Sequence, residues 1–147
     1  MKILHALVTF CAMLAFAPIE SLAQKAIPIY IESSVDTNDS TGTQVLFEIK
    51  EAIRRSAGFR LVDSQDEWPY IRHAIVFMAV GTQTIVSHSF IYDSKAMPLN
   101  GAFIYHSVQY CPRIDQAKAC AARVMGSIDH ASDELKRVSP ALWKTLR

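Results

Sequence analysis

The chain of 147 residues carries 15 Lys and Arg against 14 Asp and Glu, a net charge of +1 without a long run of either sign. This balance speaks against a nucleic-acid-binding protein, whose basic face would normally appear in the composition. The length allows one compact domain behind an amino-terminal export segment and is too short for two.

The first 23 residues have the pattern of a signal peptide. Lys2 precedes an apolar run at residues 3–17, and Ser21-Leu22-Ala23 places small residues at −3 and −1 of a cut after residue 23. The run is short for a membrane span, and a retained anchor is the alternative. Cys11 lies in the segment that cleavage would discard. We therefore expect residues 24–147 to form a single exported domain, periplasmic or secreted, with no membrane span after cleavage.

A strand followed by an amphipathic helix opens this domain. Residues 26–33 alternate isoleucines with more polar neighbours, which is typical of a half-buried strand. The helix starts at Thr41, which forms a capping box with Gln44, and it ends at Gly58 in the left-handed conformation. The apolar stripe of this helix consists of Val45, Leu46, Ile49, Ala52 and Ile53.

Four strands and a second helix follow. Residues 59–62 form a short strand, and residues 70–80 form a strand that is apolar on both parities and therefore covered on both faces. Gly81-Thr82-Gln83 makes a hairpin turn into a strand at residues 84–93, and a longer turn leads to the last strand, residues 102–110. A helix at residues 114–138 repeats apolar residues at three- and four-residue steps, and Pro140 begins a short helical tail, residues 140–147.

Two cysteines, Cys111 and Cys120, remain after cleavage. An even pair in an exported chain predicts a disulfide. A redox role would need the closer CxxC spacing that tunes a thiol, and two cysteines alone do not make a metal site.

Histidines on three successive strands are the best catalytic candidates, since the chain has no GxSxG, HExxH or P-loop motif. We expect His88 and His106 to share one face of the sheet. Ser87, Ser89, Ser107 and Gln109 then form a polar stripe on the other face. His73 would lie two to four residues along from His88, too far for the three rings to share one zinc ion. We therefore expect no catalytic residue, no cofactor and no metal.

The stretch LFEIKEAIRRSAGFRLVDSQDEWPYIRHAIVFM, Leu46 to Met78, carries a resemblance to a known family. An apolar-faced helix ending in S-x-G-F, a short strand ending in V-D, an acidic loop and a long apolar strand are similar to the amino-terminal domain of the translocation protein TolB and to related domains of the curli secretion family. The chain departs from that pattern at Glu67-Trp68-Pro69, where Ala-Asp is usual. The resemblance implies an envelope domain that acts through protein contacts, and it assigns no functional residue here.

These elements predict an α+β fold, a two-layer sandwich with strand order 2-1-3-4-5 in a mixed five-stranded sheet. The chain order is β-α-β-β-β-β-α, with two helices on one face. The second face then needs a cover, which is the tail with Trp143 and Leu146, a dimer mate or a client protein. Trp68 is either a lid over one end of the core or an exposed anchor for a partner.

The sequence therefore predicts a small periplasmic or secreted binding protein that acts by protein contact, with an envelope protein or a second copy as its partner. Candidate contact residues are Trp68, Val76, Met78 and Trp143. The alternatives are an inhibitor or immunity-type protein, a purely structural subunit, and a small enzyme that uses the strand histidines.

Overall fold

The computed structural model describes residues 25–96 and 101–147. The signal-peptide prediction falls outside these residues. The chain forms β1 (Ile27–Val35), α2 (Ser40–Arg55), β2 (Phe59–Val62), β3 (Tyr70–Val80), β4 (Gln83–Asp93), β5 (Ala102–Cys111), a 3-10 turn (Ile114–Gln116), α3 (Ala117–Val138) and α4 (Pro140–Thr145). The predicted α+β fold class is confirmed.

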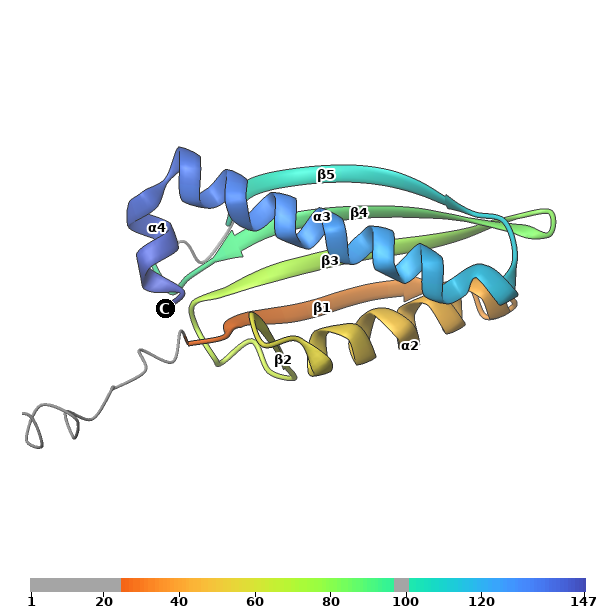
Figure 1. Cartoon of the computed structure of the whole chain (residues 1–147), viewed down its shortest axis with the longest axis horizontal. Helices are drawn as coiled ribbons and strands as arrows, with labels where there is room; N and C mark the ends of the chain where they lie inside the picture. The colour runs from red at the N-terminus through yellow and green to blue at the C-terminus, as the bar shows by residue number, and fades with distance from the viewer. Residues whose placement is uncertain (1–24, 97–100) are drawn as a thin grey trace, which may run out of the picture.

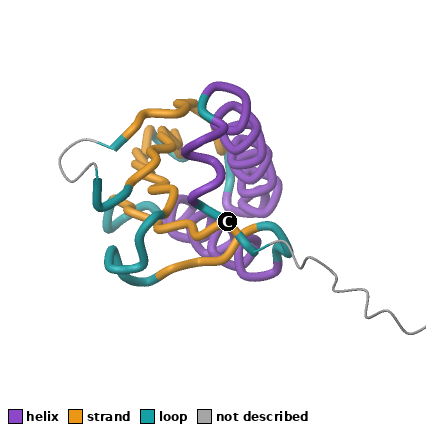
Figure 2. Tube along the Cα trace, turned by 90° about the vertical axis from the view of Figure 1, so that its left-hand side faces the viewer, coloured by secondary structure: helices purple, strands orange, loops and turns teal. Residues whose placement is uncertain are grey.

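One five-stranded sheet runs through the molecule in the order β2-β1-β3-β4-β5, as predicted. β1 is parallel to both β2 and β3, whereas β3, β4 and β5 are successively antiparallel. Figure 1 shows α2 and α3 lying along the sheet, and the end view in Figure 2 shows the helices gathered on one side of the strands. The sheet therefore has an inner face under the helices and an outer face turned away from them.

The core fills the space between the helices and the inner face. Val45, Ile49 and Ile53 of α2 are fully buried, as the predicted stripe requires. They meet inward-facing strand residues such as Ile29 and Ile75 in one hydrophobic cluster. Burial of each such side chain contributes about 1.5–3 kcal/mol before the entropy of folding is subtracted, so this layer is the main source of stability.

The ends of α2 differ from the prediction. Its N-cap is Asp39, not Thr41, and the Oδ1 atom of Asp39 accepts hydrogen bonds from the Gly42 amide at 2.7 Å and from the Thr84 hydroxyl at 2.7 Å. The second bond joins the helix start to β4. At the other end Gly58 does not adopt positive φ, and the Ser56 hydroxyl accepts the Gly58 amide instead. The side chains of Asp39 and Ser56 thus take the place of the predicted capping box and the predicted left-handed glycine.

Cys111 and Cys120 lie at disulfide-bonding distance, with Cα atoms 5.9 Å apart and both side chains fully buried. Cys111 ends β5 and Cys120 lies in the first turn of α3. The pair therefore fastens the second long helix to the edge of the sheet.

The carboxyl-terminal tail, one of the three expected covers, does not lie on the outer face. Trp143 and Leu146 are 8% and 2% exposed and belong to the same core cluster as the inner-face residues. The hydroxyl groups of Tyr92 and Thr145, 2.7 Å apart, join the tail to β4. The helix α4 is therefore part of the helical layer, and Trp143 is not available as a contact residue.

Candidate interaction surface and buried histidine pair

The outer face carries a continuous group of apolar side chains on β3, β4 and β5. Two cross-strand rows build it: Met78 lies beside Ile85, which lies beside Tyr110, and Val76 lies beside Ser87, which lies beside Val108. Five of the apolar side chains are 45–61% exposed and Ile85 is partly buried. We call this group the apolar patch; its members are Val76, Met78, Val80, Ile85, Val108 and Tyr110.

The patch includes the outer set of β3 side chains, for which the expected cover was the tail, a dimer mate or a client protein. The apolar residues of β3 on both parities led us to expect cover on both faces, yet only the inner set, which includes Ile75 and Phe77, is buried. Val76, Met78 and Val80 point the other way and no described element lies over them. Val76 and Met78 were predicted contact residues. Val80, Val108 and Tyr110 were missed, although the alternation of Val108 and Tyr110 with polar neighbours was the available signal.

The other end of the outer face is polar and aromatic. Arg72 donates to Asp93 at 2.8 Å and to Glu32 at 3.1 Å. Burial raises the pKa of Asp93, and the adjacent Arg72 guanidinium opposes that shift. Trp68 and Tyr70 follow, with ring centroids 5.0 Å apart. The outer face is therefore divided into a charged end and an apolar end.

Trp68 lies at this charged end and not in the apolar patch. It is half-buried and lines a cavity of about 450 Å³ together with Pro69, Tyr92 and Leu142. Because it closes the end of the sheet near α4, its position agrees with a lid over the core more than with an exposed anchor.

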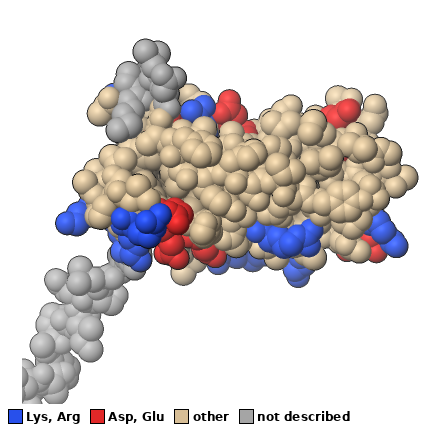
Figure 3. Space-filling view, turned by 90° about the horizontal axis from the view of Figure 1, so that it is seen from above, with Lys and Arg blue, Asp and Glu red and all other residues tan. Residues whose placement is uncertain are grey.

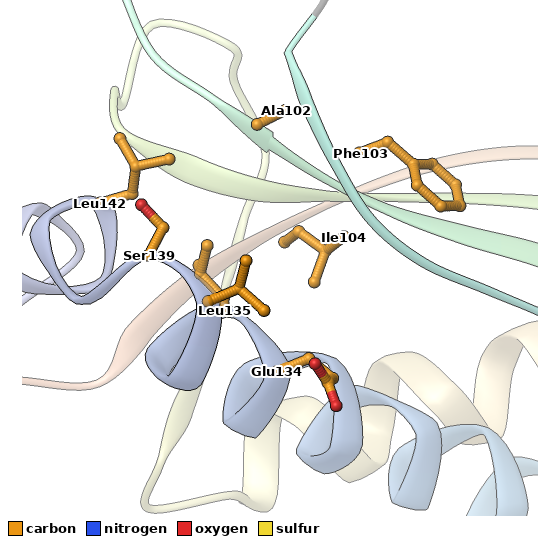
Figure 4. Close-up of a pocket in the computed structure, with 8 residues that line it drawn as sticks. Ala102, Phe103, Ile104, Glu134, Leu135, Ser139 and Leu142 are labelled. Carbon is orange, nitrogen blue, oxygen red and sulfur yellow. The ribbon is translucent and has the colours of Figure 1, made fainter.

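A smaller cavity of about 150 Å³ lies between the start of β5 and the end of α3 (Figure 4). Ala102, Phe103 and Ile104 form one wall, and Leu135, Val138 and Leu142 are among the residues of the other. Phe103 and Val138 at its rim are 66% and 67% exposed. Glu134 and Ser139 complete a lining that is otherwise apolar.

The two inner-face histidines meet inside the core. The Nε2 atom of His73 lies 3.3 Å from Nδ1 of His88, and both side chains are at most 1% exposed. The chain continues from Nε2 of His88 to Gln109 at 3.2 Å, and Gln109 donates to the Ser127 hydroxyl of α3 at 3.2 Å. His73 Nδ1 remains buried without a partner. This chain ties β3, β4, β5 and α3 together through polar atoms.

Both rings are held neutral. Burial lowers the pKa of His73 well below its ordinary value of 6.5, and the neighbouring His88 adds to that effect. Burial likewise lowers the pKa of His88 to about 4, with a further contribution from His106. Because the fold disfavours their protonated forms, both rings are neutral at neutral pH, and neither ring lines the two cavities at the α4 end of the molecule.

The predicted arrangement of histidines and polar residues is wrong. His88 pairs with Ser107 and His106 pairs with Ser89. Even-numbered residues of β4 therefore face the same side as odd-numbered residues of this part of β5. His88 points inward and His106 lies exposed on the outer face, where its Nδ1 contacts the Ser89 hydroxyl at 3.0 Å. His73 pairs with Phe90, which is two residues along from His88 and within the expected range of two to four, and the two rings meet along the diagonal between β3 and β4. The polar stripe is consequently split between the two faces.

Within the described ranges, no group of three or more His, Cys, Asp or Glu side chains is placed to hold a metal ion. None of the described helices is long and apolar enough to cross a membrane. No protein-family model and no curated protein matches this chain.

Proposed function

We propose that this protein is an exported binding protein of the cell envelope, periplasmic or secreted, that acts by contact with another protein through its apolar patch. The observation that supports this most is the exposure of Val76, Met78 and Val80 along the outer face of the central strand β3, whose inner-face neighbours Ile75 and Phe77 are buried. Soluble monomers rarely leave a contiguous apolar area of several hundred Å² without a use for it.

The composition of the patch also fits a protein contact. Its members are aliphatic residues, one Met and one Tyr, without a charged side chain, and Met and Tyr are enriched at the centres of protein interfaces. The ion pairs of Arg72 with Glu32 and Asp93 stand at one end, in the position of a polar rim. The separation of His88 and His106 onto opposite faces removes the convergence on which the enzyme alternative depended.

The proposal is tested by placing a photoreactive amino acid at Met78 in producing cells and illuminating them. The matched control carries the same amino acid at Lys118, which is exposed on α3 on the other side of the molecule. We expect a discrete adduct from position 78 that position 118 does not give. An equal set of adducts from both positions, or none from position 78, would contradict the proposal.

A further inference from the structure

β5 is an edge strand without the usual protection against pairing. Its ten residues, Ala102–Cys111, include no Lys, Arg, Asp, Glu or Pro, and its register irregularity lies near its start, opposite Phe90 and Ile91. The opposite edge, β2, has only four residues and carries Arg60, which is ion-paired with Glu67. Because charges, proline and short length are what keep edge strands apart, β5 is the edge suited to accept another strand.

The surface around this edge is uncharged as well. Figure 3 looks down on the β5 side of the molecule, and the Lys, Arg, Asp and Glu side chains lie near its margins while its broad middle carries none. Phe103, Val108 and Tyr110 of β5 are each about half exposed or more. A strand that approaches this side meets backbone and apolar side chains along most of β5, and at one end it meets Arg123, which donates to the Tyr110 carbonyl.

Helix α3 runs antiparallel to β5 beside this edge. Contacts between them show which α3 residue lies next to which β5 residue. Arg123 donates to the Tyr110 carbonyl at 2.9 Å. Further along, His130 lies against the Tyr105 ring, with centroids 4.8 Å apart, and Glu134 lines the cavity beside Ile104. A cation therefore stands level with one end of β5, and level with the other end stands a carboxylate that is ion-paired with Arg137 of its own chain at 2.6 Å.

We propose that β5 pairs antiparallel with β5 of a second copy about a twofold axis at Ser107, which joins two sheets into one continuous sheet. Such an axis exchanges the ends of the strand, so that Tyr110 lies opposite Ile104 of the second copy. Arg123 of each copy is then level with Glu134 of the other. Opposite charges meet across the seam twice, and this self-complementarity favours a second copy over an unrelated strand.

The exposed apolar area supports the same occupant. Phe103 and Val138 flank this edge outside the apolar patch and are 66% and 67% exposed, so a second copy at the edge would cover apolar side chains there.

This inference does not rest on the proposed function, because it concerns the strand edge and the proposed binding surface lies on the outer face. An axis perpendicular to the sheet leaves both apolar patches open on the same side of the dimer. Failure of the dimer would leave the partner contact at Met78 untouched, and the reverse also holds.

The first test is the mass in solution. The full chain, expressed with its own leader and purified, should show by light scattering twice the mass of one copy, with dissociation on dilution. A monomer at every concentration up to the solubility limit overturns the proposal, even if β5 accepts strands from other proteins.

The second test locates the axis by cysteine crosslinking in a Cys11→Ser background. Directly opposite residues of antiparallel strands have Cα atoms about 4.5–5.5 Å apart, within disulfide range, so Ser107→Cys should give a covalent dimer on mild oxidation. Val108→Cys is the matched control: its Cα atoms would be about 8 Å apart across the seam, although Val108 is more accessible than Ser107. Crosslinking at 108 and not at 107, or equally at both, overturns the axis. The light-scattering result remains decisive if the Ser107→Cys variant folds poorly.

Discussion

Acid should destabilise this protein through the buried pair of histidines before most of its carboxylates titrate. In the unfolded chain His88 regains a pKa near 6.5, whereas its pKa in the fold is about 4. Between these two values the unfolded state binds a proton that the native state does not, so stability present at neutral pH is lost as the pH falls below about 6.5. For His88 alone the loss between pH 7.5 and pH 5 is about 2 kcal/mol, and His73, whose pKa is lowered in the same direction, adds to it.

Urea denaturation at pH 7.5, 6.5, 5.5 and 5.0 measures this loss. His88→Gln retains groups that can bond to His73 and Gln109 but does not titrate, so its stability should fall by about 2 kcal/mol less than that of the unchanged protein at pH 5. His106→Gln is the matched control, because His106 is exposed on the outer face and its replacement should preserve most of the acid loss. The reasoning is refuted if the unchanged protein is equally stable at pH 7.5 and 5, or if His106→Gln abolishes the loss and His88→Gln does not.

Three further predictions concern the disulfide, the cap of α2 and the burial of α4. Unfolded but unreduced protein processed after residue 23 should contain no free thiol, since Cys111 and Cys120 lie at disulfide-bonding distance; two free thiols in a thiol titration would disprove this. Asp39→Ala should lower the free energy of unfolding by about 1–3 kcal/mol, because it removes the cap of α2 and the bond from Thr84, whereas Asp36→Ala, in the exposed loop, should change it by less than about 0.5 kcal/mol. Trp143→Ala should cost about 3–5 kcal/mol against little for the exposed Lys144→Ala, and equal effects in urea denaturation would show that α4 is not part of the core.

The fold could be predicted from local sequence patterns because these patterns determine which residues are buried. The stripe Val45, Ile49 and Ile53 needs a sheet beneath it, and Gly81, with φ of +64°, marks a two-residue turn that fixes the pairing of β3 with β4. A short connection leaves few registers open, so this hairpin and the strand order followed from the sequence.

The arrangement of side chains between β4 and β5 did not follow, because the connection there is longer and the register is shifted opposite Phe90 and Ile91. A one-residue slip moves every side chain of a strand to the other face, which is why His88 and His106 were wrongly placed together. The bond between Asp39 and Thr84 joins residues 45 positions apart, and the burial of Trp143 depends on where α3 ends in space. The periodicity of the sequence indicates neither the approach of Thr84 to Asp39 nor the position of the end of α3.

The central claim is that the apolar patch binds a partner protein, and the most direct measurement is a binding titration with the protein captured at position 78, once purified. Met78→Lys places a charge in the middle of the patch and should raise the dissociation constant at least about tenfold, equivalent to about 1.4 kcal/mol of binding free energy. Phe47→Lys, which changes an equally exposed apolar residue on α2, should leave the constant unchanged. Equal affinities for Met78→Lys and the unchanged protein, or a greater loss for Phe47→Lys, would contradict the account.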